Sequence, residues 1–425
     1  QVPQVFIPYK EVLDVYHAGL QVPDEVTLMW CDDNYGYIRH FPTAEERARK
    51  GGNGVYYHVS YWGRPHDYLW LGTAHPSLVY QQMSLAYERG IQKMWILNVG
   101  DIKPAEYQVE LFLDMAWNLE EVKQQGIAAH QRHFLEREFG KNRADRLQPV
   151  MQEAYRLAYI RKPEFMGNTR TEEKDPKFKV ISDLPWCEQE INERLAAYRQ
   201  LSDKVEQEWH ALPAQKKETY FQLVKYPVQA AAQMNNKLLT AQLARHGKAD
   251  WADSDRAYDS IVSLTKTYNT TKWNRMMDFQ PRRLLVFNRV ERKALSSGLL
   301  EKPQAVYTWN GADCVEGASV ICEGLGYEGK AVAVEKKKEL TFEFAAWETD
   351  SVEVEVRLLP NHPVEGERLR FTISLDGSAT EAVSYETKGR SEEWKENVLC
   401  NQAVRRMILP VARKASHRLI FTALD

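Results

Sequence analysis

Long apolar runs and runs of basic residues are both missing from this sequence. The longest apolar stretches, such as 94–97, are far shorter than the roughly 20 residues that a membrane helix needs. The chain has 56 basic and 59 acidic residues, with a formal net charge of -3, and its basic residues form no long run. We therefore expect no membrane insertion and no nucleic-acid partner.

Cysteine is also scarce, since the chain has five cysteines in all and no CxxC pair. This pattern favours neither a zinc ribbon nor a disulfide framework. The histidines lack metal-ligand spacing, and no triad of histidine, aspartate and cysteine is readable, so no metal site is expected. The chain begins at Gln1 without a charged segment followed by an apolar one, so a signal peptide is expected to be cleaved or absent.

The chain is long enough for two or three domains, because it has 425 residues. Residues 1–118 alternate between helix and strand, which predicts parallel strands. We expect helices at 9–20 and 76–90, and strands at 25–31, 54–61 and 93–99. A complete (β/α)8 barrel takes about 250 residues, so we interpret this region as the latter part of such a barrel. An open doubly wound sheet is the alternative, but its GxGxxG fingerprint is missing.

The remaining chain divides into a helical domain, 119–290, and a C-terminal β domain, 291–425. Helical periodicity predicts helices at 109–125, 143–159, 187–212, 216–244 and 251–274. Period-two alternation predicts strands at 340–344, 352–358 and 369–375, with turns at 360–363 and 376–377. The predicted fold is therefore multidomain, α/β plus α plus β: a partial barrel, a helical domain and a C-terminal antiparallel β-sandwich that stops short of its last strand.

The first candidate site follows the strand 25–31. Asp32 and Asp33 leave this apolar strand and enter a loop that holds Tyr37 and Arg39. The candidate substrate contacts here are Trp30, Tyr37 and Arg39. Hydrolysis of a glycosidic bond needs one carboxylic acid and a second carboxylate, so either aspartate is a candidate for one role. Neighbouring strand residues point to opposite faces, so at most one of them faces the barrel mouth. An Asx turn or a helix cap is the alternative.

The second candidate site is the segment 54–70. Alternation puts Tyr56 and His58 on one face of a strand, so we expect His58 at the barrel mouth. Aromatic and imidazole rings suit a sugar, whose apolar face stacks on rings while its hydroxyls need hydrogen bonds. A buried structural histidine and structural aromatics are the alternative. The candidate substrate contacts in this segment are Tyr56, His58, Trp62, Arg64 and His66.

The third candidate site lies at the end of the strand 93–99 and comprises Asn98 and Asp101. Asn98 can donate to a sugar hydroxyl or to the carboxylate of an acidic sugar. Asp101 is a substrate contact or the cap of a helix that opens near Pro104, and we favour the cap. Arg39, Arg64 and His66 are candidate partners for a uronate carboxylate, because a planar guanidinium binds it bidentately. Solvated surface positions remain the alternative for these three.

Several long motifs in order resemble glycoside hydrolase family 115. The barrel motifs are WCDDNYGYIRHFP, GGNGVYYHVSYWGRPHDYLWL and KMWILNVGDIKPAE, and the helical-domain motifs are RKPEFMGN and MMDFQPRRL. The resemblance implies an inverting α-1,2-glucuronidase without cofactors, which removes glucuronic acid or its 4-O-methyl form from xylan. Its substrates would be glucuronoxylan or aldouronic acid oligosaccharides. It further implies a homodimer and a periplasmic or extracellular location.

Two departures from the family qualify this resemblance. Family members carry several hundred residues ahead of the motif at Trp30, so we expect the chain to be a fragment that lacks part of the active site. Residues 81–83 read Gln-Gln-Met where many relatives have a glutamate. Asp32 or Asp33 would then be one catalytic carboxylate. The neighbours that the resemblance implies are Tyr37, Arg39, His58, His66 and Asn98.

Two other functions remain open at this point. One is a non-catalytic carbohydrate-binding or scaffold protein, and the other is a different glycosidase specificity on the same frame. An intact Asp-Asp-Asn-Tyr-Gly loop favours chemistry, because a scaffold does not require a carboxylate there.

Overall fold

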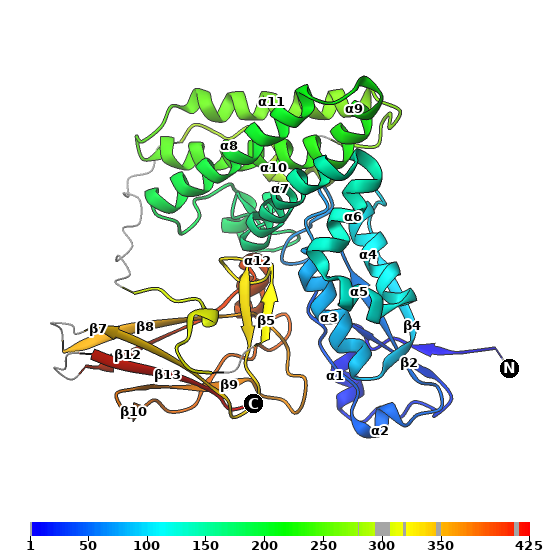
Figure 1. Ribbon diagram of the computed structural model, residues 1–425, viewed down its shortest axis with the longest axis vertical. Coiled ribbons are helices and arrows are strands. Elements are labelled where there is room, and N and C mark those ends of the chain that lie inside the picture. The colour runs from blue at the N-terminus through cyan, green and yellow to red at the C-terminus, as the bar shows by residue number, and fades with distance from the viewer. Residues whose placement is uncertain (1, 279, 294–306, 318–319, 346–349, 412–415) are drawn as a thin grey trace. The chain divides into compact units, whose positions relative to one another are not determined.

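The computed structural model describes residues 2–278, 280–293, 307–317, 320–345, 350–411 and 416–425 (Figure 1). The chain folds into two compact units. The first unit comprises Gln1–His58, Ser77–Leu97 and Gln304–Asp425, and the second comprises Val59–Pro76 and Asn98–Pro303. The first unit thus groups the N-terminal sheet with the C-terminal β-rich segment. The sequence-based boundaries at 118 and 290 stay a prediction.

A four-stranded sheet with the order β1-β2-β3-β4 opens the first unit. Its strands are β1 (Val5–Phe6), β2 (Thr27–Cys31), β3 (Asn53–His58) and β4 (Ile91–Asn98), and its helices are α1 (Glu11–His17), α2 (Ala44–Arg47) and α3 (Pro76–Glu88). The pairs β1–β2 and β2–β3 are parallel. Every residue of β2 is buried, as expected for an apolar strand within a parallel sheet. The predicted parallel sheet is confirmed, whereas four strands alone do not show a closed barrel.

Helices make up most of the second unit. They are α4 (Glu106–Trp117), α5 (Leu119–Gln125), α6 (Ile127–Phe139), α7 (Lys141–Ile160), α8 (Glu188–His210), α9 (Ala214–Tyr220), α10 (Tyr226–Arg245) and α11 (Trp251–Asn269). The predicted helix at 109–125 is two helices, because Asn118 leaves the helical conformation and caps α5. The predicted helix at 216–244 is also interrupted, by a π-helical turn at Phe221–Lys225. α6 was not predicted.

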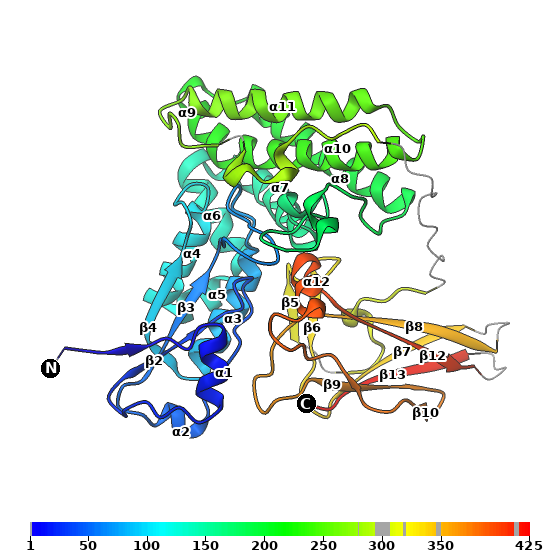
Figure 2. The same ribbon diagram turned by 180° about the vertical axis from the view of Figure 1, so that it is seen from behind.

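α10 lies at the centre of these helices and packs against both α8 and α11 (Figures 1 and 2). Arg194 of α8 is 6% exposed and crosses to the neighbouring helices. Its guanidinium donates to Asn235 Oδ1 of α10 at 2.7 Å, to the Leu157 carbonyl of α7 at 3.0 Å and to the Arg161 carbonyl at 2.8 Å. A buried charge is tolerated here because three acceptors, from α10 and from the C-terminal end of α7, surround it.

Antiparallel sheets form the C-terminal part of the first unit. The elements are β5 (Val320–Glu323), β6 (Lys330–Ala333), β7 (Glu339–Ala345), β8 (Ser351–Leu358), β9 (Arg370–Leu375), β10 (Ser378–Ala379), β11 (Val383–Ser384), α12 (Glu392–Cys400), β12 (Ala403–Pro410) and β13 (Ser416–Ala423). One sheet has the order β10-β9-β13-β7 with β11 on β9, and β8 pairs with β12 and β5 with β6. Alternate side chains of β7 and β9 form the core, and the apolar side of β8 packs against it.

The helix α12 interrupts this β-rich segment and was not predicted. Ser391 caps it, since its hydroxyl accepts a hydrogen bond from the Trp394 amide at 3.1 Å. Trp394 itself is 3% exposed. In the described part of the chain, no helix combines the length and the apolar composition that crossing a bilayer requires.

Candidate active site

The chain reverses direction immediately after β2, in residues 32–39, which we name the acidic loop. The Asp33 amide donates to the Tyr37 carbonyl at 2.8 Å, and the Arg39 amide returns to the Cys31 carbonyl at 3.2 Å. Gly36 has a φ of +99°, and a Cβ at this position would lie 2.8 Å from Leu78 Cδ2. Only glycine combines this backbone conformation with such a close approach to α3.

Asp32 pairs with His58 at the ends of two neighbouring strands. Asp32 Oδ1 lies 2.5 Å from His58 Nδ1, and Asp32 Oδ2 accepts a hydrogen bond from the Gly36 amide at 2.9 Å. Both side chains are buried, with exposures of 2% and 3%. Burial raises the pKa of Asp32, and the nearby imidazole only partly opposes this. The pair is therefore suited to hold a proton and to release it.

Aromatic rings surround His58. Tyr9 stacks on the imidazole with a centroid distance of 6.1 Å, and Tyr56 contacts it edge-on at 5.3 Å. In β3 only Tyr56 is partly exposed and the other residues, His58 included, are buried, so burial along the strand does not show the predicted alternation. Tyr9, which sequence reasoning missed, reaches the acidic loop by donating to Asn34 Oδ1 at 2.7 Å.

Asp33 has a different environment from its neighbour. Its Oδ1 accepts hydrogen bonds from the amides of Tyr35 at 2.9 Å and Tyr37 at 3.2 Å, which is an Asx turn. Its Oδ2 accepts from Trp394 Nε1 at 2.8 Å and lies 3.4 Å from His362 Nε2. Both oxygens thus face groups that hold the loop. Asp32 differs because one of its oxygens faces His58, a side chain that can exchange a proton, so Asp32 is the stronger candidate for acid–base chemistry.

Further residues distant in the sequence bind the same loop. The Tyr37 hydroxyl donates to Asn401 Oδ1 at 2.9 Å. Gln82 of α3 accepts a hydrogen bond from the Ile38 amide at 2.8 Å and donates to Asn361 Oδ1 at 3.3 Å. Sequence reasoning missed the loop partners Asn361, His362, Trp394 and Asn401, because they lie more than 300 positions from the loop and form no local pattern with it.

Trp30 and Arg39 are the other predicted contacts in the first unit. Trp30 is fully buried, and its indole donates to Asn53 Oδ1 at 2.9 Å. It therefore builds the interior beside the sheet. Arg39 is partly buried beside Gly389, where an added Cβ would lie 2.4 Å from the guanidinium, and it donates to the Lys10 carbonyl at 3.5 Å.

Trp62, Arg64 and His66 belong to the second unit. Trp62 is 62% exposed, and Arg64 donates to the Glu172 carbonyl at 2.6 Å. His66 is buried between the Asp67 carbonyl at 2.8 Å and the Thr169 hydroxyl at 3.1 Å. Burial lowers the pKa of His66 to about 4, so at neutral pH it has no charge to offer a uronate.

Asn98 and Asp101 also lie in the second unit. Asn98 is partly buried, and its carbonyl accepts a hydrogen bond from the Val59 amide at 3.2 Å. The predicted cap at Asp101 is wrong. A separate turn, in which the Ala105 amide donates to the Ile102 carbonyl at 2.8 Å, comes first, so α4 begins only at Glu106 and is capped by no side chain.

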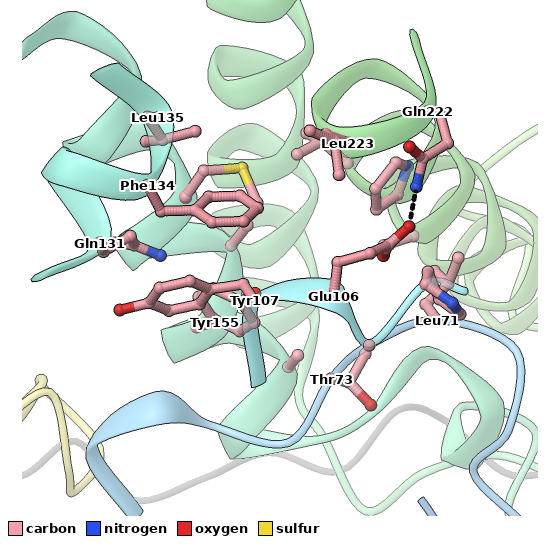
Figure 3. Close-up of a pocket in the computed structure, with 18 residues that line it drawn as sticks. Leu71, Thr73, Glu106, Tyr107, Gln131, Phe134, Leu135, Tyr155, Gln222 and Leu223 are labelled. Carbon is pink, nitrogen blue, oxygen red and sulfur yellow. Dashed lines mark hydrogen bonds between the residues drawn. The ribbon is translucent and has the colours of Figure 1, made fainter. Parts of the chain in front are cut away.

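A cavity lies within the second unit (Figure 3). Glu106 and Gln222, the latter from the π-helical turn, are hydrogen-bonded in its wall, and Lys103 also pairs with Glu106. The carboxylate is already neutralised, so the cavity offers no free acid–base pair. Its wall consists of Leu71, Gly72, Thr73, Pro104, Glu106, Tyr107, Gln131, Phe134, Leu135, Met151, Ala154, Tyr155, Ala158, Gln222, Leu223, Pro227, Val228 and Ala231.

Among the described residues, Glu110, Asp114 and His130 could together offer three ligand atoms to a metal ion. Their side chains are engaged with protein partners instead. Glu110 accepts from Arg137 through both oxygens, at 2.6 and 2.5 Å, and Asp114 Oδ2 lies 3.0 Å from His130 Nε2. These ion pairs account for the cluster as a contact between α4 and α6.

Comparison with known proteins identifies the family of the chain. A model described as glycosyl hydrolase family 115 matches residues 1–165, and a model of the family 115 C-terminal domain matches residues 318–425. The chain belongs to glycosyl hydrolase family 115, which confirms the resemblance carried by the motifs. Comparison with curated proteins found no match.

One solved structure is similar over the whole chain. It is described as a family GH115 4-O-methyl-alpha-glucuronidase with specificity for decorated arabinogalactans. The identity is 68% and the TM-score 0.98, and the match covers 100% of this chain. The chain spans 56% of the length of that structure.

Proposed function

We propose that this chain provides part of the active site of an α-glucuronidase. The enzyme hydrolyses the bond that joins glucuronic acid, or its 4-O-methyl form, to a plant polysaccharide. Family membership and the 68% identity to a 4-O-methyl-alpha-glucuronidase support the reaction class. The observation that carries the proposal is the buried pair of Asp32 and His58 at adjoining strand ends.

The general acid in this proposal is Asp32. Glycosidases need one carboxyl group that is still protonated when the substrate binds, and burial raises the pKa of Asp32 in that direction. Asp32 gives its proton to the leaving oxygen, and the resulting carboxylate is stabilised by the Gly36 amide and by His58. Asp33 already accepts from three donors and lies 3.4 Å from His362, so the second carboxyl group of an inverting pair, about 6.5–9.5 Å away, is another residue.

The finer features are part of the same proposal. Candidate substrates are glucuronoxylan with its aldouronic acid oligosaccharides, cleaved at α-1,2 linkages, and decorated arabinogalactans, on which the similar enzyme acts. The sheet β1–β4 would belong to a (β/α)8 barrel, and the C-terminal sheets would form a β-sandwich. By family resemblance the protein would be a homodimer in the periplasm or outside the cell.

The test is release of glucuronate from aldouronic acids and from arabinogalactan oligosaccharides by the protein that carries this chain. We expect Asp32→Asn to lower kcat by about 100- to 10,000-fold, as for loss of a general acid. Asp203→Asn, at an exposed position of α8, is the matched control and should retain activity. Activity that survives Asp32→Asn would remove Asp32 from the mechanism, and sugar binding by the wild type without release would favour a carbohydrate-binding protein.

A further inference from the structure

The helix α12, which lies about 360 positions further along the chain, binds the acidic loop. Both ends of α12 take part. Trp394, in its first turn, donates to Asp33, and Asn401, which follows its last residue, accepts from Tyr37. Since contacts at both ends fix the helix against the loop, α12 and the acidic loop form one assembly within the first unit.

We propose that Trp394 and His362 are positioning residues for the reaction: through Asp33 they hold the acidic loop so that Asp32 meets His58. The proposal rests on the proposed function in so far as it concerns turnover. Its structural part, that these side chains determine the order of residues 32–39, stands by itself. Both residues place a ring nitrogen against Asp33 Oδ2, so their effect on chemistry is transmitted by Asp33.

The geometry of Asp33 carries this inference. One carboxylate oxygen organises the loop by accepting the Tyr35 and Tyr37 amides, and the other faces Trp394 and His362. Asp33 is 3% exposed, so water cannot readily replace a lost donor. The Tyr35 ring also packs edge-on against the Trp394 ring at 5.8 Å. Removing the indole N–H therefore loosens the carboxylate that keeps the loop folded.

Movement of Asp33 changes the active site because Asp32 is its covalent neighbour. The Gly36 amide, which donates to Asp32 Oδ2, lies between the two amides that Asp33 binds. A loop released from Asp33 would lose the 2.5 Å contact of Asp32 with His58 and the stabilisation of the Asp32 carboxylate together. Positioned groups of this kind affect rate steeply, since small displacements of a catalytic group are costly.

The experiment is a double-mutant cycle of Asp33→Asn and Trp394→Phe in the whole protein. Trp394→Phe removes the N–H donor and keeps an aromatic ring in the buried site. We measure kcat and KM, the pH profile of kcat/KM, and hydrogen exchange of the Tyr35, Gly36 and Tyr37 amides. The control is Asp376→Asn, which alters a carboxylate that faces His417 at 2.8 Å and accepts from the Arg418 amide at 3.1 Å among the C-terminal strands.

We expect Trp394→Phe to lower kcat at least about tenfold and to speed exchange of the three amides by a similar factor, the size of one charge-assisted hydrogen bond. KM should change less than kcat, the alkaline limb of the pH profile, where a general acid loses its proton, should shift, and the double variant should resemble Asp33→Asn. His362→Asn, as a second variant, should act in the same direction. Asp376→Asn should change none of these.

Additive effects of Asp33→Asn and Trp394→Phe would overturn the proposal, as would loop exchange that rises no more than in Asp376→Asn. Failure of the proposed function has a different signature. If Asp32→Asn retains full activity while Trp394→Phe still loosens the amides of residues 35–37, then α12 holds the loop but the loop does not carry the general acid.

Discussion

Replacement of Gly36 by alanine tests the geometry of the acidic loop most directly. Gly36 has a φ of +99°, which costs a residue with a side chain about 1–2 kcal/mol. The new methyl group would lie 2.8 Å from Leu78 Cδ2 and 3.0 Å from the Tyr57 hydroxyl, and such overpacking costs about 1–3 kcal/mol. We therefore expect a loss of about 2–5 kcal/mol in the free energy of unfolding.

The matched control is Gly377→Ala. Gly377 has a φ of +90°, similar to that of Gly36, but a Cβ there meets nothing within 4 Å. This variant should lose only the conformational cost, about 1–2 kcal/mol. Urea unfolding measures the free energy of unfolding of both variants, and the two losses are compared with the dependence on urea concentration held at the same slope. Equal losses would refute the close packing of Gly36 against α3 and with it the reason for glycine in the loop.

Two further predictions concern the second unit. Arg194→Met should destabilise the protein by about 3–5 kcal/mol, because Asn235 and two backbone carbonyls lose a buried charged donor. Thermal unfolding measures this loss. The control Arg199→Met, on the exposed side of α8, should change stability by less than about 0.5 kcal/mol. Lys237 is fully buried, and burial lowers its pKa from the usual 10.5 to about 7. Between pH 7 and about pH 10.5 Lys237 is therefore protonated in the unfolded chain and neutral in the folded protein. In this range the free energy of unfolding should rise by up to about 1.4 kcal/mol per pH unit, and below pH 7 this contribution should not change with pH. Lys237→Met should remove that rise in urea titrations at pH 7, 8 and 9, and an unchanged slope would contradict it.

Several elements follow from local sequence alone. β2 was predictable because an uninterrupted apolar run is what a strand buried on both faces requires. The alternation expected for β3 placed Tyr56 and His58 on one face, and their rings do meet edge-on, although burial does not alternate along the strand. α12 was missed because its nine residues lie among strands, and β1 because two residues cannot show a period. The cap assigned to Asp101 failed because helix boundaries depend on the turn that precedes them.

The sequence by itself determined the family, the parallel sheet with its polar strand ends, and the candidacy of Asp32 and Asp33, because ordered motifs and hydrophobic periods are local properties of the chain. Only the tertiary structure gave the two aspartates different surroundings. Adjacent carboxylates have the same sequence context, but one meets His58 across the sheet and the other meets Trp394 and His362 from the C-terminal segment. Contacts between residues more than 300 positions apart depend on how the chain packs, and no local pattern encodes them.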